Sequence, residues 1–335
     1  MNHALVNSIL CGDATEVIRT IPDQMVHCVV TSPPYYGLRD YGDAGQVGLE
    51  NGPKEYIDRL VGIFSEVRRV LRDDGTLWLN IGDSYAGSGK AGGGKNRPEY
   101  PHMPRTSEGA KRKDLLGIPW MLAFALRADG WYLRQDIIWQ KPNAMPESVQ
   151  DRCTKSHEYI FLLSKSPNYY FDAAAIREAA VGFDNSPIAG SAGTFGNPQA
   201  RKRKGNARTF RGGGAYTKGQ SFENSAGVER ESHGNIQNET GLRNKRSVWE
   251  VATKNTTNFH YAVYPEELIV PCISAGCPEG GTVLDPFMGT GTTAVVAKKL
   301  GRNYLGIEIM PANVEYTQRR LDLIPENLFI EEVRA

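Results

Sequence analysis

The stretch 282-TVLDPFMGTGTTAVVAKKLGRNYLGIEIM-310 decides the fold of this chain. A short apolar strand ends at Asp285, a turn with two glycines follows, and a helical pattern begins at Thr292. A second strand then ends at Glu308. A strand, a helix and a second strand in this order predict a βαβ unit with parallel strands.

The same alternation extends over most of the 335 residues. The predicted strands are residues 8–12, 25–30, 76–81, 131–139, 158–163, 282–286 and 303–309. The predicted helices are residues 54–75, 115–130, 265–277 and 292–301, with Gly75 and Gly130 as C-terminal caps of the first two. Strands that alternate with helices predict an α/β fold, in which helices cover both faces of a mostly parallel sheet.

Composition is that of an ordinary soluble chain, with 40% hydrophobic residues, 23% charged residues and a net charge of +1. No apolar run reaches the roughly 18 residues that a membrane span requires, and the N-terminus lacks a signal-peptide pattern. We therefore expect a cytoplasmic protein without a membrane partner. The five cysteines form no CxxC pair and the six histidines are scattered, so we expect reduced thiols and no metal site.

Two stretches break the alternation. Residues 83–113 are rich in Gly, Lys and Arg and predict a mobile basic loop, and residues 166–256 lose all periodicity. A stretch of that length inside a compact domain has a role of its own or is disordered. It contains a cluster of basic residues, Arg201, Lys202, Arg203, Lys204, Arg208 and Arg211. Local basic loops on a nearly neutral chain indicate contact with phosphates, and a solvated disordered loop is the alternative.

The turn after Asp285 has the order D-P-F-x-G-x-G-T-T, which differs from the G-x-G-x-x-G of NAD enzymes. Gly289 and Gly291 let the backbone pass close to a ligand. An acid at the end of the next strand, here Glu308, accepts hydrogen bonds from ribose hydroxyls. Together these residues predict a site for a nucleoside cofactor. The glycine pair alone is also compatible with a tight strand–helix turn.

A second unusual turn, 28-CVVTSPPYYG-37, follows the predicted strand 25–30. With the cofactor turn, it resembles the S-adenosylmethionine-dependent amino-methyltransferases of DNA, through TSPPYYG, DPFMGTGTT and GIEI. The order of the motifs resembles the beta group of that family. Other segments of the chain are also similar to the family, namely 11–30, 130–148, 157–166 and 260–268.

The resemblance implies a Rossmann-like methyltransferase fold with a sheet of about seven strands and a circularly permuted motif order. It implies a catalytic half at residues 1–165, a target-recognition insertion at residues 166–256 and a cofactor-binding half at residues 257–335. It also implies double-stranded DNA as a partner and a role in DNA methylation and restriction-modification. A cognate restriction endonuclease and the oligomeric state stay open.

The family's functional residues transfer to this chain position by position. The catalytic tetrad is Ser32, Pro33, Pro34 and Tyr35. The cofactor-binding residues are Asp13, His260, Pro265, Asp285, Pro286, Phe287, Gly289, Gly291, Thr292 and Glu308. Lys141 and Asn143 match a segment that contacts the flipped base or the DNA backbone, although Pro142 between them is equally a strand terminator.

The chemistry of amine methylation explains the tetrad. The exocyclic amine of a base is a poor nucleophile because its lone pair is delocalised into the ring. Acceptors aimed at its N–H bonds stabilise the positive charge that develops during transfer. Ser32 and the carbonyl of Pro33 are such acceptors, and the prolines stiffen the turn. Tyr35 offers an aromatic face to a base flipped out of the duplex. A plain strand-ending turn is the alternative.

Ser32 at the first tetrad position favours N4 of cytosine as the target, because in this family Ser usually accompanies cytosine N4 and Asp or Asn adenine N6. Adenine N6 is the first alternative, and an RNA or protein amine is a further one. Cytosine C5 methylation requires a cysteine nucleophile in a Pro-Cys turn. Pro271 and Cys272 have this order, but they fall in the predicted helix 265–277.

The sequence therefore predicts that Cys272→Ser leaves methyl transfer intact. The measurement is the rate of methyl incorporation into DNA beside that of the wild type. Loss of methylation with cofactor binding preserved would contradict it.

Overall fold

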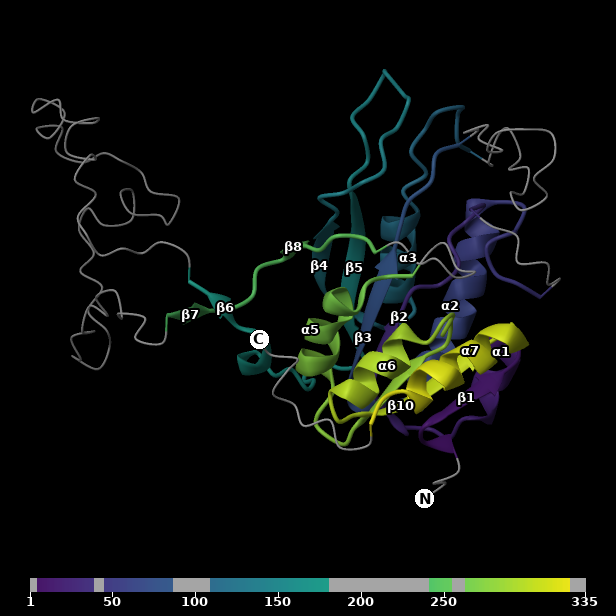
Figure 1. Cartoon of the computed structure of the whole chain (residues 1–335). Coiled ribbons are helices and arrows are strands. Elements are labelled where there is room, and N and C mark those ends of the chain that lie inside the picture. Colours follow the sequence, from purple (N-terminus) through teal and green to yellow (C-terminus); the bar gives the residue numbers. More distant parts are fainter. Residues whose placement is uncertain (1–4, 39–44, 87–108, 181–240, 255–262, 326–335) are drawn as a thin grey trace, which may run out of the picture. The chain divides into compact units, whose positions relative to one another are not determined.

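The computed structural model describes residues 5–38, 45–86, 109–180, 241–254 and 263–325 (Figure 1). Its strands are β1 (Ser8–Cys11), β2 (Val26–Thr31), β3 (Leu71–Ile81), β4 (Tyr132–Gln140), β5 (His157–Ser164), β6 (Glu178–Ala179), β7 (Leu242–Arg243), β8 (Val248–Glu250), β9 (Thr282–Asp285) and β10 (Asn303–Glu308). Its α-helices are α1 (Ala14–Val17), α2 (Pro53–Val70), α3 (Ile118–Ala128), α5 (Glu266–Gly276), α6 (Thr292–Lys299) and α7 (Pro311–Asp322).

Eight strands of the described ranges form one sheet in the order β1-β10-β9-β2-β3-β5-β4-β8. The first five are parallel, β5 runs antiparallel to both of its neighbours, and β8 is parallel to β4. The predicted α/β fold with a mostly parallel sheet is confirmed. All seven predicted strands are present, and β8 is an eighth that the sequence pattern did not indicate.

Helices cover both faces of this sheet (Figure 1). One core lies between the sheet and α1, α2 and α3, and a second lies between the sheet and α5, α6 and α7. On α2 the buried residues Tyr56, Leu60, Phe64 and Val67 recur at the spacing of one helix face. Their burial removes apolar surface from water, which is the main stabilising contribution to such a core.

The prediction of a helix over residues 54–75 with a cap at Gly75 is wrong at its C-terminal end. Helix α2 ends at Val70, and β3 begins at the next residue, Leu71, which pairs with Val26 of β2. Gly75 lies inside β3, where a Cβ atom would come within 2.5 Å of the Leu71 side chain. Gly75 is therefore required for close packing within the strand. The predicted cap at Gly130 does adopt a left-handed conformation after α3, with φ of 99°.

The sequence pattern did not predict α7. Its Pro311 stands at the first turn, where proline is favoured. Its buried residues include the polar Asn313 and Thr317 beside Leu321, so its hydrophobic periodicity is weak.

The sheet has a switch point between β9 and β2. From β2 the chain passes through α2 to β3 on one side, and from β9 it passes through α6 to β10 on the other side. In open α/β sheets, ligands bind outside the carboxyl ends of the strands at such a point. Thr31 ends β2 and Asp285 ends β9. The tetrad begins at Ser32, one residue after the end of β2, and the first glycine of the turn, Gly289, lies four residues after the end of β9. Both segments are therefore at this point of the sheet.

A second compact unit comprises residues 177–243. Its described residues form the antiparallel pair β6–β7, which the Arg243–Glu178 ion pair at 2.9 Å joins. The basic cluster at residues 201–211 lies outside the described residues, as does most of the loop 83–113. The predicted halves and insertion, 1–165, 166–256 and 257–335, stay predictions. No helix in the described part of the chain is long and apolar enough to cross a membrane.

The five cysteines divide into two classes by burial. Cys28, Cys272 and Cys277 are buried in the second core, and Cys11 and Cys153 are exposed. Cys272 lies on α5, which confirms the predicted helix there. Burial raises the pKa of the Cys277 thiol to about 12 and raises the pKa of Cys28 and of Cys272 as well. The thiolate is the reactive form of cysteine. The buried thiols are therefore unreactive, because reagents cannot reach them and because they stay protonated.

We expect Ellman's reagent to titrate two thiols rapidly in the native protein and all five after unfolding in guanidinium. The rapid pair is assigned by mass spectrometry of the alkylated peptides. Rapid labelling of Cys272 in the native protein would contradict the burial.

Candidate active site at the carboxyl ends of β2 and β9

The buried carboxylate of Asp285 joins the two halves of the site. Its Oδ1 accepts hydrogen bonds from Thr31 Oγ1 at 2.6 Å and from the backbone N–H of Phe287 at 3.0 Å. Its Oδ2 accepts from Thr293 Oγ1 at 2.6 Å and from the Tyr264 hydroxyl at 3.0 Å. Burial raises the pKa of this carboxyl, and the four hydrogen bonds oppose that shift. Asp285 thus lies at the predicted site and ties β9 to β2, α6 and the segment before α5.

The buried carboxylate of Glu308 holds the glycine turn. Its Oε2 accepts from the N–H of Gly289 at 2.7 Å, and its Oε1 accepts from the N–H of Met310 at 2.9 Å and from Asn313 Nδ2 at 3.0 Å. Gly289 has φ of 55° and Gly291 has φ of 83°, a region that favours glycine. A Cβ atom on Gly291 would lie 2.2 Å from Thr317, so this position also requires glycine for space.

Helix α7 supports the same turn from outside. Thr317 Oγ1 donates to the Gly289 carbonyl at 3.4 Å, and Arg320 Nη1 donates to the Thr290 carbonyl at 2.6 Å. Arg320 also pairs with Glu266 of α5 at 3.4 Å. Sequence reasoning missed these residues because polar side chains on a helix usually indicate a solvated face.

The tetrad directly follows β2. The Tyr56 hydroxyl, which is buried on α2, donates to the Pro34 carbonyl at 2.8 Å. Gly48, with φ of 104°, packs so closely that a Cβ atom would lie 3.0 Å from the Tyr35 carbonyl oxygen. The N–H of Gly37 donates to the Gly48 carbonyl at 2.7 Å. These contacts fix the turn from α2 and from the loop before it.

A polar network surrounds the hydroxyl of Tyr35. It donates to Glu158 Oε2 at 2.6 Å, and it lies 3.2 Å from Asn80 Oδ1 and 3.4 Å from Ser32 Oγ. Lys141 forms an ion pair with the other oxygen of Glu158. Burial, and then the negative charge of Glu158, raise the pKa of Tyr35 well above its ordinary value. The phenol is therefore neutral, and it holds its proton for donation.

Sequence reasoning missed Glu158. The signal was an acid near the start of an otherwise apolar strand, 157-HEYIFLLS-164. Since β5 runs antiparallel to β3, its first residues lie at the same edge of the sheet as the end of β3. Asn80 comes from that end of β3 and donates through Nδ2 to the Tyr159 carbonyl at 3.1 Å.

The predicted DNA-contacting residues Lys141 and Asn143 are engaged within the protein. Lys141 pairs with Glu158 and lies 4.3 Å from the centroid of the Trp139 ring. The Asn143 side chain donates to the Thr253 carbonyl at 2.9 Å and accepts from the Thr253 N–H at 2.9 Å. Contact of either residue with DNA stays a prediction.

The other predicted cofactor residues are distributed around the same edge. Asp13 caps the N-terminus of α1, accepts from the N–H of Thr15 at 2.8 Å and lies 3.8 Å from Arg59. Pro265 precedes α5 as its N-cap, and Phe287 is partly buried against the first core. Two further predicted residues are buried, namely Pro286 and Thr292. His260 lies outside the described residues.

The ends of three neighbouring strands bring predicted residues together. Cys11 of β1 pairs with Glu308 of β10, and the N–H of Gly12 donates to the Glu308 carbonyl at 2.9 Å. Asp13, Glu308 and the glycine turn therefore follow the adjacent strands β1, β10 and β9. A Cβ atom on Gly289 would meet no described atom closer than the Phe287 carbonyl oxygen at 4.0 Å, so the turn has an open side.

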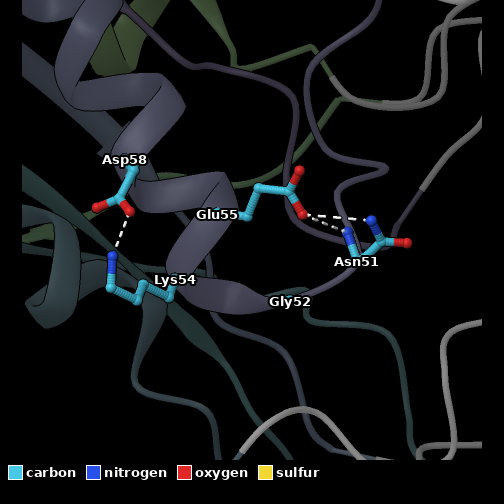
Figure 2. Close-up of a pocket in the computed structure, with 5 residues that line it drawn as sticks. All are labelled: Asn51, Gly52, Lys54, Glu55 and Asp58. Carbon is cyan, nitrogen blue, oxygen red and sulfur yellow. Dashed lines mark hydrogen bonds and ion pairs between the residues drawn. The ribbon is translucent and has the colours of Figure 1, made fainter.

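A shallow surface pocket lies at the N-terminus of α2 (Figure 2). Each of its charged side chains has a partner within the pocket: Lys54 pairs with Asp58, and Glu55 accepts from the backbone N–H of Asn51 at 3.1 Å. Of the predicted site residues that the structure describes, none lines it.

Residues 26–319 match the model of the DNA methylase family N6_N4_Mtase. The chain belongs to this family. It is a DNA methyltransferase of the amino-methylating group. The family resemblance that the two turns indicated is thereby confirmed.

Two type II methyltransferases are similar over nearly the whole chain. M.Cfr9I of Citrobacter freundii is 45% identical over 317 residues, which cover 92% of this chain and 86% of that protein. M.SmaI of Serratia marcescens is 43% identical over 312 residues, which cover 92% of this chain and 87% of that protein.

Solved structures show the same fold. The cytosine-N4-specific PvuII DNA methyltransferase aligns with a TM-score of 0.59 at 15% identity, over 96% of this chain and 88% of that one. The Thermus thermophilus protein TTHA0409, in complex with S-adenosyl-L-methionine, aligns with a TM-score of 0.53 at 22% identity, over 96% of this chain and 95% of that one. The Rossmann-like methyltransferase fold is thereby confirmed.

S-adenosylmethionine is the cofactor of this methyltransferase. The residues present fit it, because the glycine turn has an open side and a buried acid, Glu308, ends the adjacent strand. These are the features that a nucleoside cofactor requires of such a sheet edge.

We expect Asp285→Asn to lower the free energy of unfolding by about 1–3 kcal/mol, because an amide N–H₂ would face donors that now bind a carboxylate oxygen. Urea denaturation followed by circular dichroism measures the change. Asp58→Asn, on the exposed side of α2 where Asp58 pairs with Lys54, is the matched control and should leave the midpoint unchanged. Equal midpoints for Asp285→Asn and the wild type would show that the four hydrogen bonds contribute nothing.

Proposed function

We propose that this methyltransferase transfers a methyl group from S-adenosylmethionine to the exocyclic N4 of a cytosine flipped out of double-stranded DNA. The observation that carries the choice of base is Ser32 at the first tetrad position, directly after β2. Ser at this place usually accompanies cytosine N4 in the family. Adenine N6 is the alternative within the same family.

The tetrad supplies acceptors for the target amine. S-adenosylmethionine provides an electrophilic methyl group when it is bound. Ser32 Oγ and the Pro33 carbonyl accept the two N–H bonds of the amine, which stabilises the positive charge that develops on nitrogen. The N–C bond would form as the bond between the methyl carbon and the cofactor sulfur breaks, with the electron pair left on sulfur. The amine nitrogen would release one proton to solvent water.

Rigidity of the turn supports this role. Pro33 and Pro34 restrict the backbone, and Tyr56 binds the carbonyl of Pro34 at 2.8 Å. Acceptors that are held in place before the reaction require no reorganisation while charge develops. The Thr31–Asp285 hydrogen bond at 2.6 Å sets the tetrad at the end of β2 beside the end of β9.

Tyr35 offers an aromatic surface to the flipped base. Its hydroxyl is anchored on Glu158 at 2.6 Å, which fixes one edge of the ring. A flipped base loses its stacking in the duplex, and contact with an aromatic side chain offsets part of that loss.

For cofactor binding, we propose that Glu308 accepts from the ribose hydroxyls, that Asp13 contacts the adenine, and that the Gly289 turn receives the methionine part. Residues 166–256 are proposed to recognise the target sequence, with the basic cluster 201–211 on DNA phosphates. A target-recognition segment from a relative of different specificity, grafted in place of 166–256, should change the methylated sequence. An unchanged sequence would contradict this assignment.

We expect Ser32→Ala to lower the single-turnover rate of methyl transfer on the order of 10²-fold, with little change in cofactor affinity, because one stabilising contact to the transition state is lost. Rapid-quench measurement with radiolabelled cofactor gives the rate, and isothermal titration gives the affinity. Cys272→Ser, in the core away from the tetrad, is the matched control. A normal rate for Ser32→Ala would remove this hydroxyl from the mechanism.

Long-read sequencing of DNA from cells that express the protein, with mass spectrometry of its nucleosides, should reveal N4-methylcytosine in one sequence context. N6-methyladenine would establish the alternative base. Methylation of RNA or protein with unmodified DNA would overturn the proposal.

A further inference from the structure

The carboxylate of Glu158 lies beside the hydroxyl of Tyr35 in the tetrad. It accepts hydrogen bonds from three different donors. These are the hydroxyl of Tyr35 at 2.6 Å, Asn80 Nδ2 at 3.3 Å and the ammonium of Lys141. In all three contacts the carboxylate oxygens of Glu158 are the acceptors.

The carboxylate fixes the direction of the Tyr35 proton. A tyrosine hydroxyl has one proton to donate. Two acceptors compete for it, Glu158 Oε2 at 2.6 Å and Asn80 Oδ1 at 3.2 Å. The charged and closer acceptor forms the stronger bond. The amide nitrogen of Asn80 donates to the Tyr159 carbonyl, so the amide oxygen faces Tyr35. Asn80 therefore cannot donate to the Tyr35 oxygen.

Ser32 completes the chain of hydrogen bonds. Its Oγ lies 3.4 Å from the Tyr35 oxygen, and because the Tyr35 proton is on the Glu158 side, Ser32 is the donor in this contact. The proton of Ser32 then points toward Tyr35. The lone pairs of Ser32 are left to face the target amine, which is the orientation an acceptor needs.

We propose that Glu158 is a positioning residue of the methyl-transfer site, which orients the Tyr35 hydroxyl and through it presents the lone pairs of Ser32 to the target amine. This inference rests on the proposed acceptor role of Ser32. Lys141 serves it by holding Glu158, a role distinct from contact with DNA.

Glu158→Gln tests the direction of the hydrogen bonds with little change in shape. Its amide can donate to the Tyr35 oxygen, which frees the Tyr35 proton for Ser32 or Asn80. The Ser32 proton then turns toward the target amine. The Ser32 hydroxyl and the amine N–H are both donors, so no hydrogen bond forms between them. Tyr35→Phe breaks the same series of hydrogen bonds at its middle while it retains the ring.

The experiment measures single-turnover methyl transfer by full-length Glu158→Gln, Tyr35→Phe, Ser32→Ala and the double variant Ser32→Ala with Glu158→Gln. We expect Glu158→Gln to be slower by about tenfold or more, with cofactor and DNA affinities within about twofold of the wild type. In the Ser32→Ala background the same change should have an effect of less than about twofold, because the hydroxyl that Glu158 orients is gone. Glu315→Gln, on the exposed face of α7 where Glu315 pairs with Arg319, is the matched control.

The outcomes separate the two claims. Two outcomes would overturn the role of Glu158 and leave the acceptor role of Ser32 standing. In the first, Ser32→Ala is slow while Glu158→Gln transfers the methyl group at the normal rate. In the second, both single variants are slow and their rate losses multiply in the double variant. A normal Ser32→Ala would overturn the acceptor role in the proposed function, and this inference with it. If thermal melting shows that Glu158→Gln does not fold, Tyr35→Phe takes its place in the same cycle, and multiplication with Ser32→Ala again overturns the inference.

Discussion

The hydrogen bond between Thr31 and the buried carboxylate of Asp285 is the contact on which the site depends. It joins residues 254 positions apart at the ends of the adjacent strands β2 and β9. The tetrad begins one residue after Thr31, and the glycine turn begins shortly after Asp285. A buried carboxylate without donors would be strongly unfavourable, so the hydroxyls that satisfy Asp285 are constrained in position. The same constraint sets the proposed catalytic tetrad beside the proposed cofactor turn.

The permuted order of the chain does not disturb this arrangement. The proposed catalytic residues come first in the sequence and the proposed cofactor turn comes last, yet both lie at the switch point of one sheet. Helices from the two halves then hold the turns from outside: α2 binds the Pro34 carbonyl through Tyr56, and α7 binds the Thr290 carbonyl through Arg320. Each turn is rigid because a helix outside the turn itself supports it. Such support suits acceptors that must be in place before charge develops.

Much of the architecture was predictable, because apolar periodicity reports which face of an element is buried. It located seven strands and four helices, but it extended α2 over residues 71–75, since Leu71 fits the helical spacing while its backbone pairs with Val26. It missed α7, whose buried face carries Asn313 and Thr317. In the site, the sequence did not indicate the ion pair of Lys141 with Glu158. Contact of Lys141 with the flipped base or the DNA backbone stays a prediction.

The sequence by itself determined the βαβ cofactor unit, the Ser-Pro-Pro-Tyr turn and the membership of the chain in the amino-methyltransferases, because each is a local pattern of backbone and side-chain chemistry. Only the tertiary structure decided which groups donate hydrogen bonds to Asp285 and Glu308, and which helices support the two turns. It also decided that Glu158 accepts a hydrogen bond from Tyr35. Those contacts join strands and helices that are distant in the chain. Hydrogen-bond partners depend on distance and direction in space, and a linear pattern of residue types contains neither.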